Sequence, residues 1–186
     1  VEREDNRQAL RSMVRAIDES SRAAGQLLDH AMITFRADHL ETRTLDLVEL
    51  VEDLVTRLAP VAEMKDIALT VISEGAVSVE ADSILLQNAL RNLVENALKY
   101  APEESEITLE VGASPRPRVE VRDEGPGFPP DQMQGLAVRF SRGDNAKDTI
   151  GSGLGLTIAQ DVATAHGGEL TLGNMPEGGA CVTFLL

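Results

Sequence analysis

The first forty residues show one hydrophobic pattern, in which apolar positions recur at alternating spacings of four and three. A heptad seam with charged side chains around it is typical of a helix that packs on a partner helix, and it predicts a helix over about residues 3–37. Nothing later in the chain obviously matches this seam, so we expect its partner in another chain, in a segment outside this sequence, or in both. A helix that folds back onto the following residues is the alternative. The seam positions are Leu10, Val14, Ile17, Ser21, Ala24, Leu28, Ala31 and Phe35.

After residue 40 the pattern changes to short elements of helical and strand periodicity. A polar connector at 41–44 leads to an expected short strand at 45–48 and then to a helix that ends before Pro60, because proline lacks a backbone donor. Asp82 is a suitable N-cap for a second helix, which Pro102 stops. The remaining expected elements are strands at 67–72, 77–79, 106–112 and 118–122, a helix from about 154 to 166, and a hairpin of 169–172 with 180–186.

Composition narrows the class of protein. Hydrophobic residues make up 42% of the 186 positions but aromatic residues only 3%, so we expect an aliphatic core. The formal net charge of −14 argues against a nucleic-acid partner, because neutralising phosphates requires clustered Lys and Arg. No apolar stretch approaches the roughly 20 residues that span a bilayer, and the chain begins at Val1 rather than Met. We therefore interpret the chain as a soluble portion of a longer protein.

One side of the helix expected after Asp82 carries three amides and a lysine. Asn88, Asn92, Asn96 and Lys99 follow one another at steps of four, four and three, which places them on the same side of a helix. Asn is a poor helix former, so this stripe suggests a function, with a solvated polar face as the alternative. Amide oxygens suit Mg²⁺, which also binds a nucleotide's phosphates, and a lysine supplies a positive charge for phosphate. The adjacent residue is the only tyrosine, whose ring is able to pack on a base or a sugar.

A carboxylate followed by two glycines lies at the end of the strand expected at 118–122. Asp123 is separated by single residues from Gly125 and Gly127, which leaves a hydrogen-bond acceptor beside a backbone open to a flat ligand. The exocyclic amine of adenine is a donor of the appropriate kind. An ordinary Asp-Gly turn is the alternative.

A glycine-rich turn precedes the last expected helix. Glycines at alternate positions allow close approach of the backbone, and a helix N-terminus favours an anion such as phosphate. A plain turn is the alternative, since the run has neither the ending of a P-loop nor the spacing of a dinucleotide-binding turn. The turn consists of Gly151, Ser152, Gly153, Leu154, Gly155 and Leu156.

Residues 129–150 form a long segment between the strands and this turn. Loops of such length inside a compact domain are usually functional or mobile. Within it Arg139 and Arg142 flank Phe140, so that two cations lie beside one apolar anchor. We interpret the segment as a lid over a ligand.

Taken in order, these motifs resemble the catalytic, ATP-binding part of bacterial sensor histidine kinases over about residues 40–186. The fold that this resemblance implies is α/β, a two-layer sandwich of a mixed sheet covered by helices, shared with gyrase, mismatch-repair and chaperone ATPases. Those relatives usually have a Glu at the position of Asn92, where it acts as general base for hydrolysis, so the Asn favours a kinase. The matching motifs are Asn92-Leu-Val-Glu-Asn96-Ala-Leu-Lys99-Tyr100, Asp123-x-Gly125-x-Gly127, Arg139-Phe140-Ser141-Arg142, Gly151 to Leu156, and His166-Gly167-Gly168.

The resemblance implies a role for each matching residue. Asn96 would hold Mg²⁺ with help from Asn92, and Lys99 would meet the phosphates of ATP. Tyr100 would pack on the nucleoside, and Asp123 would accept a hydrogen bond from the adenine amine. The implied reaction transfers the γ-phosphoryl group to a histidine, mainly through positioning and charge neutralisation.

The two glycine motifs and the lid complete the implied site. The backbone at 151–155 would line the phosphates, and the arginines of the lid would act in catalysis. Residues implied to bind the nucleotide here are Gly125, Gly127, Phe140, Gly151, Ser152, Gly153, Leu154, Gly155 and Leu156, while Arg139 and Arg142 join Asn92, Asn96 and Lys99 as catalytic.

The family's phosphoacceptor motif, His-Glu/Asp-Leu-Arg-Thr-Pro, is absent from the chain. Neither His30 nor His39 has that context, so neither is interpreted as an acceptor. Residues 1–40 resemble the second helix of the dimerisation hairpin that normally carries the motif, and residues 41–186 resemble the catalytic domain. We therefore expect ATP binding without self-phosphorylation.

The resemblance also implies partners and a location. A cognate response regulator would receive the phosphoryl group, the hairpin helices would form a homodimer, and the segment would be the cytoplasmic portion of a sensor anchored in the inner membrane through parts outside this sequence. Two other functions remain open: a serine kinase of the anti-sigma-factor type, and a non-catalytic scaffold that binds nucleotide.

Overall fold

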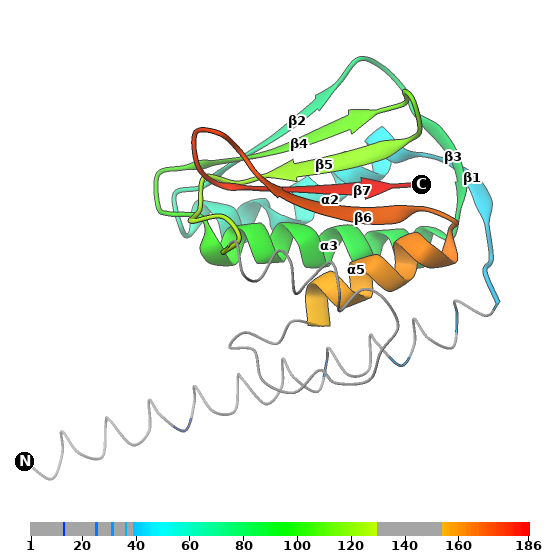
Figure 1. Ribbon diagram of the computed structural model, residues 1–186, viewed down its shortest axis with the longest axis horizontal. Helices are drawn as coiled ribbons and strands as arrows, with labels where there is room; N and C mark the ends of the chain where they lie inside the picture. Colours follow the sequence, from blue (N-terminus) through cyan, green and yellow to red (C-terminus); the bar gives the residue numbers. More distant parts are fainter. Residues whose placement is uncertain (1–12, 14–24, 26–30, 32–35, 37–38, 130–153) are drawn as a thin grey trace, which may run out of the picture.

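The computed structural model describes residues 39–129 and 154–186, together with Met13, Gly25, Ala31 and Arg36. Its main feature is a five-stranded mixed sheet in the order β2-β4-β5-β7-β6 (Figure 1). β2 and β4 pair in parallel, whereas the other neighbours pair antiparallel. The strands are β2 Ala68–Ser73, β4 Glu106–Gly112, β5 Arg118–Arg122, β6 Glu169–Asn174 and β7 Ala180–Leu185.

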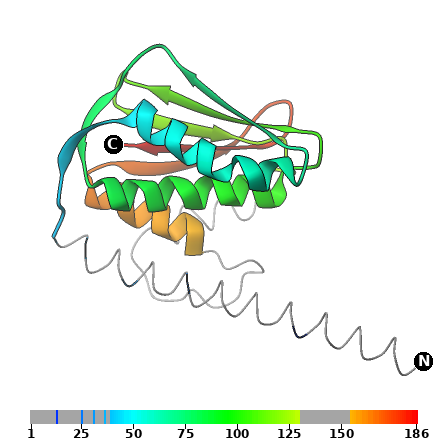
Figure 2. The same ribbon diagram turned by 180° about the vertical axis from the view of Figure 1, so that it is seen from behind.

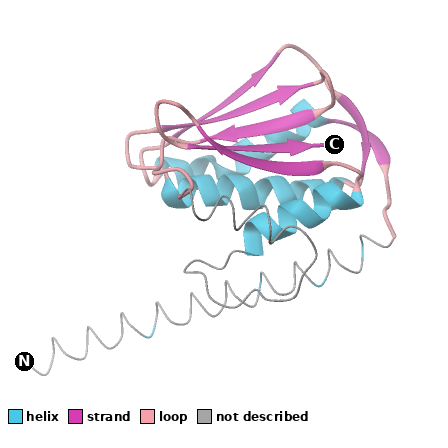
Figure 3. Ribbon diagram, viewed as in Figure 1, coloured by secondary structure: helices cyan, strands magenta, loops and turns pink. Residues whose placement is uncertain are grey.

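Three helices cover one face of this sheet. They are α2 Leu47–Glu63, α3 Ser83–Tyr100 and α5 Leu154–Ala165, and both opposite views place them on the same side (Figures 1 and 2). Alternate residues of β4, β5 and β7 are buried, as expected for a sheet with one covered face. The separate layers of helices and strands confirm the predicted two-layer α/β sandwich (Figure 3).

The core is aliphatic, as the composition predicts, and centres on α3. The helix buries a continuous face between the sheet and its two neighbouring helices, and Phe184 of β7 is the one aromatic side chain among the fully buried large residues of the described part. The buried residues of α3 are Leu85, Leu86, Ala89, Leu90, Asn92, Leu93, Val94, Ala97 and Leu98.

Both predicted ends of the first helix of the domain, after a strand at 45–48 and before Pro60, are wrong. A small antiparallel pair is formed by β1 Arg43–Asp46 and β3 Ser78–Ala81, and Asp46 then caps α2 by accepting from the backbone N–H of Val48 at 2.9 Å. The cap therefore starts the helix where a strand was expected. α2 continues through Pro60 to Glu63, because Pro60 lies on the exposed side of the helix while Leu54, Leu58 and Ala62 pack on the core side of the same turns.

The helix predicted over 3–37 lies largely outside the described residues, and the described residues within it are helical. Among the helices that the structure describes, none is long and apolar enough to cross a bilayer.

Candidate functional site

The predicted stripe of amides lies on α3, with its members in different environments. Asn92 is only 8% exposed, and its amide nitrogen donates to the carbonyl of Asn88 at 2.8 Å. This bond fixes the amide and leaves its oxygen as an acceptor. Asn96 is half-buried, and no described residue forms a hydrogen bond with its side chain. Among the described residues, none competes with a ligand for its amide oxygen.

The end of α3 carries the two exposed residues of the same motif. The Lys99 ammonium lies 4.9 Å from the centre of the Tyr100 ring, and both side chains are exposed. This cation–π contact holds a positive charge and an aromatic face side by side. A positive charge and an aromatic ring therefore lie together at the end of α3.

Asp123 follows β5 and is only 6% exposed. Its Oδ1 accepts from the backbone N–H groups of Gly125 at 2.8 Å and Ala180 at 3.4 Å. Burial raises the pKa of this carboxyl, and the two backbone hydrogen bonds oppose the rise without cancelling it. No described residue donates to Oδ2, which leaves this oxygen as an acceptor for a ligand donor.

Gly125 brings the Asp123 turn against the end of α3. A Cβ at this glycine would lie 2.8 Å from Oδ1 of Asp123 and 2.9 Å from the carbonyl oxygen of Tyr100. Such distances leave no room for a side chain. The requirement for glycine here therefore comes from close approach of two site elements, and not from an ordinary turn.

Gly155 is the residue of the second glycine motif whose surroundings the structure describes most clearly. A Cβ on it would lie 3.2 Å from Oδ1 of Asn92, so the start of α5 packs closely on the amide stripe of α3. Leu154 begins α5, and Leu156 is half-buried in its first turn. The other predicted residues, namely Arg139, Phe140, Arg142, Gly151, Ser152 and Gly153, lie outside the described residues.

The β6–β7 hairpin supports the Asp123 turn through a contact that no pattern in the sequence predicted. Asn174 accepts from the N–H of Phe128 at 2.7 Å and donates to the carbonyl of the same residue at 2.8 Å. Gly127, the residue before Phe128, has φ +71°, and a Cβ there would lie 2.8 Å from Oδ1 of Asn174. The only signal in the sequence was an Asn in a glycine-rich turn, which is more often a local turn residue.

Replacing Asn174 by Ala is expected to lower the free energy of unfolding by about 1–3 kcal/mol, because two hydrogen bonds across the turn are lost. Chemical denaturation measures the change, and Glu177→Ala on the same exposed hairpin is the control. Equal stability of the two variants would show that the contact with Phe128 contributes nothing.

A divalent cation at this site would depend on amide oxygens. Among the described residues no group of three or more His, Cys, Asp or Glu is arranged to hold a metal ion. Two amide oxygens fit such a cation. The side chain of Asn96 has no hydrogen-bond partner among the described residues, and the oxygen of Asn92 is left as an acceptor. Mg²⁺ needs few protein ligands when phosphate oxygens complete its coordination shell.

Comparison with known proteins identifies the family. Residues 81–186 match the histidine kinase-, DNA gyrase B-, and HSP90-like ATPases. The chain belongs to this ATPase family. Its matched region begins at the residue before Asp82 and includes every described part of the candidate site.

Within the ATPase family, the relatives of this chain are sensor histidine kinases. The sensor protein KdpD of Escherichia coli strain K12 is 36% identical over 168 residues, which cover 90% of this chain and 19% of KdpD. Full-length ShkA in complex with AMPPNP is 29% identical with a TM-score of 0.74, over 94% of this chain and 38% of ShkA. The catalytic domain of the histidine kinase ThkA is 26% identical with a TM-score of 0.68, over 77% of this chain and 95% of that domain.

The chain spans well under half of the length of its curated relatives. The match to the ThkA catalytic domain, which is almost fully covered, supports the assignment of this chain to the catalytic ATP-binding portion of a histidine kinase.

Proposed function

We propose that this chain is the kinase portion of a two-component sensor, which binds ATP with Mg²⁺ and transfers the γ-phosphoryl group to a histidine outside residues 1–186. The observation that carries the proposal is the close packing of three motifs around one helix. Gly125 packs the Asp123 turn on Tyr100, and Gly155 packs the second glycine motif on Asn92 of the same helix. A nucleotide bound along α3 would meet all three.

The adenine end of this proposed site is the Asp123 turn. The Oδ2 of Asp123 would accept from the adenine amine, while Oδ1 stays held by Gly125 and Ala180. Tyr100 would cover the nucleoside from the end of α3. AMPPNP in the complex of the related ShkA supports a nucleotide as the ligand.

The phosphate end is the amide stripe and the start of α5. Asn96, with Asn92 beside it, would hold Mg²⁺, and Lys99 would contact the phosphates. When bound, the cation supplies charge neutralisation to the transferred group. The backbone at 151–155 would line the phosphates, and Arg139, Phe140 and Arg142 would close over them. No carboxylate lies at position 92 to activate water, which favours phosphoryl transfer over hydrolysis.

The proposal assigns residues 41–186 to the catalytic domain and residues 1–40 to the second helix of a dimerisation hairpin. The hairpin helices would form a homodimer in the longer protein, and a response regulator would receive the phosphoryl group. The heptad seam is the support for the hairpin assignment. Anchoring of the longer protein in the inner membrane belongs to the same proposal.

Incubation with γ-labelled ATP and Mg²⁺ tests the reaction. A separately produced dimerisation hairpin of a sensor histidine kinase is supplied as acceptor. We expect acid-labile label on the hairpin and none on this chain, because no acceptor motif is present in it. Label on this chain alone would contradict the assignment of the acceptor, and ATP binding without label anywhere would favour a nucleotide-binding scaffold.

Replacing Asn96 by Ala is expected to remove most of the Mg²⁺ dependence of nucleotide affinity. The amide oxygen that would hold the cation is lost, whereas the Asp123 turn is untouched. Calorimetric titration with an ATP analogue, with and without Mg²⁺, measures the effect, and Asn88→Ala is the control because Asn88 contributes its backbone carbonyl to the bond with Asn92. An Asn96 variant with undiminished Mg²⁺ dependence would contradict this role.

A further inference from the structure

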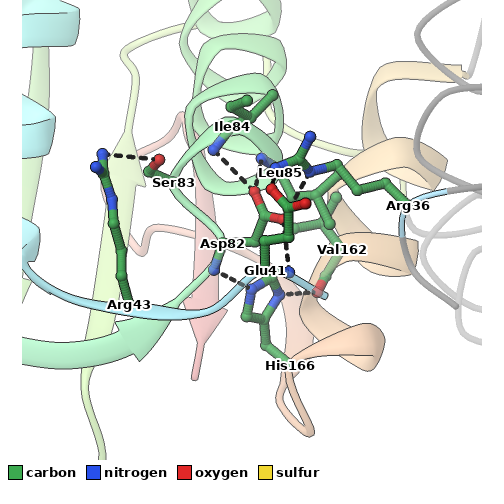
Figure 4. A network of polar contacts seen from close by, with 9 residues as sticks. All are labelled: Arg36, Glu41, Arg43, Asp82, Ser83, Ile84, Leu85, Val162 and His166. Atoms are coloured by element: carbon green, nitrogen blue, oxygen red, sulfur yellow. Dashed lines mark hydrogen bonds and ion pairs between the residues drawn. The ribbon is translucent and has the colours of Figure 1, made fainter. Parts of the chain in front are cut away.

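A buried aspartate at the start of α3 joins three separate parts of the chain, two through its carboxylate and one through its backbone. The Asp82 side chain is only 1% exposed. Its Oδ1 accepts from the backbone N–H groups of Ile84 and Leu85, which makes it the N-cap of α3. Its Oδ2 accepts from Nε of Arg36 at 2.7 Å and from the N–H of Glu41 at 3.2 Å (Figure 4).

The same residue connects α3 to the end of α5. The backbone N–H of Asp82 donates to Nε2 of His166 at 3.0 Å, and Nδ1 of that ring lies 2.8 Å from the carbonyl oxygen of Val162 (Figure 4). The ring therefore accepts on Nε2 and donates from Nδ1, as a neutral imidazole does. This contact gives His166 a structural role at the opposite end of α5 from the glycine motif.

Arg36 is the member of the cluster that comes from before β1. It is separated from Asp82 by 46 positions, and its guanidinium bridges two carboxylates, since one NH₂ group also lies 2.9 Å from Glu41. Burial by itself raises the pKa of Asp82, but the hydrogen bonds from Arg36 and the backbone outweigh it and hold the pKa below its ordinary value. The rigid fork of an arginine suits such a bridge.

We propose that Arg36 is a positioning residue, which fixes the direction in which the segment before β1 leaves the catalytic domain. The bridge ties that segment to a point fixed by both α3 and α5. Asn96 comes fourteen positions after Asp82, which corresponds to about 21 Å along the helix. Arg36 therefore acts on the placement of the segment and not on nucleotide affinity. Its consequence for presenting an acceptor histidine rests on the proposed function.

Spin labels measure this placement directly. Met13 is 63% exposed and Thr171 lies exposed on β6, so Met13→Cys and Thr171→Cys accept labels once Cys181 is replaced by Ser. Labelled chain is diluted with unlabelled chain so that only distances within one chain are measured. We expect a clearly broader distance distribution for Arg36→Met than for the parent, with Arg36→Lys between them, because a single ammonium replaces the two N–H groups that contact Asp82 and Glu41.

Arg57→Met is the matched control, because Arg57 forms an exposed pair with Asp53 at 3.9 Å and is expected to leave the distribution unchanged. Glu41→Gln removes the ion pair between Arg36 and the Glu41 carboxylate but keeps the hydrogen bond of Arg36 to Asp82. It is therefore expected to broaden the distance distribution less than Arg36→Met. It also serves as the second variant if Arg36→Met does not fold. Equal distributions for the parent, Arg36→Met and Glu41→Gln would overturn the proposal.

Nucleotide affinity provides the second readout. We expect Arg36→Met to bind an ATP analogue within about twofold of the parent, because distant sites without shared partners act independently. A much larger loss would show that Arg36 acts through the fold of the site, and would overturn the positioning role. Failure of the parent itself to bind the analogue would contradict the proposed function and leave the distance result to be judged alone.

Discussion

Asp123→Asn is expected to weaken binding of an ATP analogue by about 10- to 100-fold, the value of one hydrogen bond to a charged group. The amide oxygen of Asn is able to keep the bonds from Gly125 and Ala180, so the turn stays in place. What is lost is the negative acceptor at Oδ2, where an amide presents either a neutral oxygen or a donor. Titration with the analogue measures the loss.

The same substitution is expected to raise the stability of the free protein near neutral pH. Because burial raises the pKa of Asp123 in the fold, the folded protein holds an extra proton between the unfolded pKa, about 3.9, and the folded pKa. Stability of the parent therefore falls as pH rises through this window and stays reduced above it. The stability of the Asn variant relative to the parent therefore increases as the pH rises from the unfolded to the folded pKa of Asp123.

Melting temperatures of the two proteins from pH 4 to 8 test this opposition of binding and stability. Asp53→Asn is the control, since Asp53 is an exposed member of an i,i+4 pair on α2. If Asp123→Asn loses binding and is also equally stable or less stable than the parent at every pH, the carboxylate supports the fold and not a ligand.

Gly179→Ala is expected to lower the free energy of unfolding by about 2–5 kcal/mol, as the sum of backbone strain and steric overlap. Gly179 has φ +96°, and a Cβ there would lie 2.0 Å from the carbonyl oxygen of Asp123. Relief of this overlap must move either the hairpin or the Asp123 turn. A loss of nucleotide affinity is therefore expected along with the loss of stability.

Its neighbour provides a matched control within the same turn. Gly178 has φ +100° but no atom within 4 Å of an added Cβ, so Gly178→Ala carries the strain of about 1–2 kcal/mol without the overlap. Denaturation of both variants separates the two effects. Equal losses for Gly178→Ala and Gly179→Ala would mean that the hairpin does not press on Asp123.

The resemblance to histidine kinases implied the sandwich, whereas local patterns in the sequence predicted most of its strands and helices. The strands and α3 follow from periodicity and capping, because Asp82 and Pro102 mark the ends of α3 through interactions with their near neighbours. The predicted end of α2 was wrong because the helix continues past Pro60 to Glu63, with Leu54, Leu58 and Ala62 buried along its core side. That burial depends on tertiary packing, which a local rule does not contain.

The contacts that support the site were not predictable in the same way. Asn174 and Phe128 are separated by 46 positions, and Asp82 and His166 by 84. None of these residues belongs to a periodic pattern that pairs it with the other, so only the fold brings them together. Gly125 was predictable only in part, since its motif was visible in the sequence but its contact with the Tyr100 carbonyl was not.

The proposed ATP site is tested most directly by calorimetric titration of this chain with a non-hydrolysable ATP analogue, with and without Mg²⁺, alongside Asp123→Ala. We expect saturable binding that Mg²⁺ strengthens and that the substitution abolishes. Absence of binding by the folded parent under both conditions, or undiminished binding by the Asp123 variant, would contradict the proposed site.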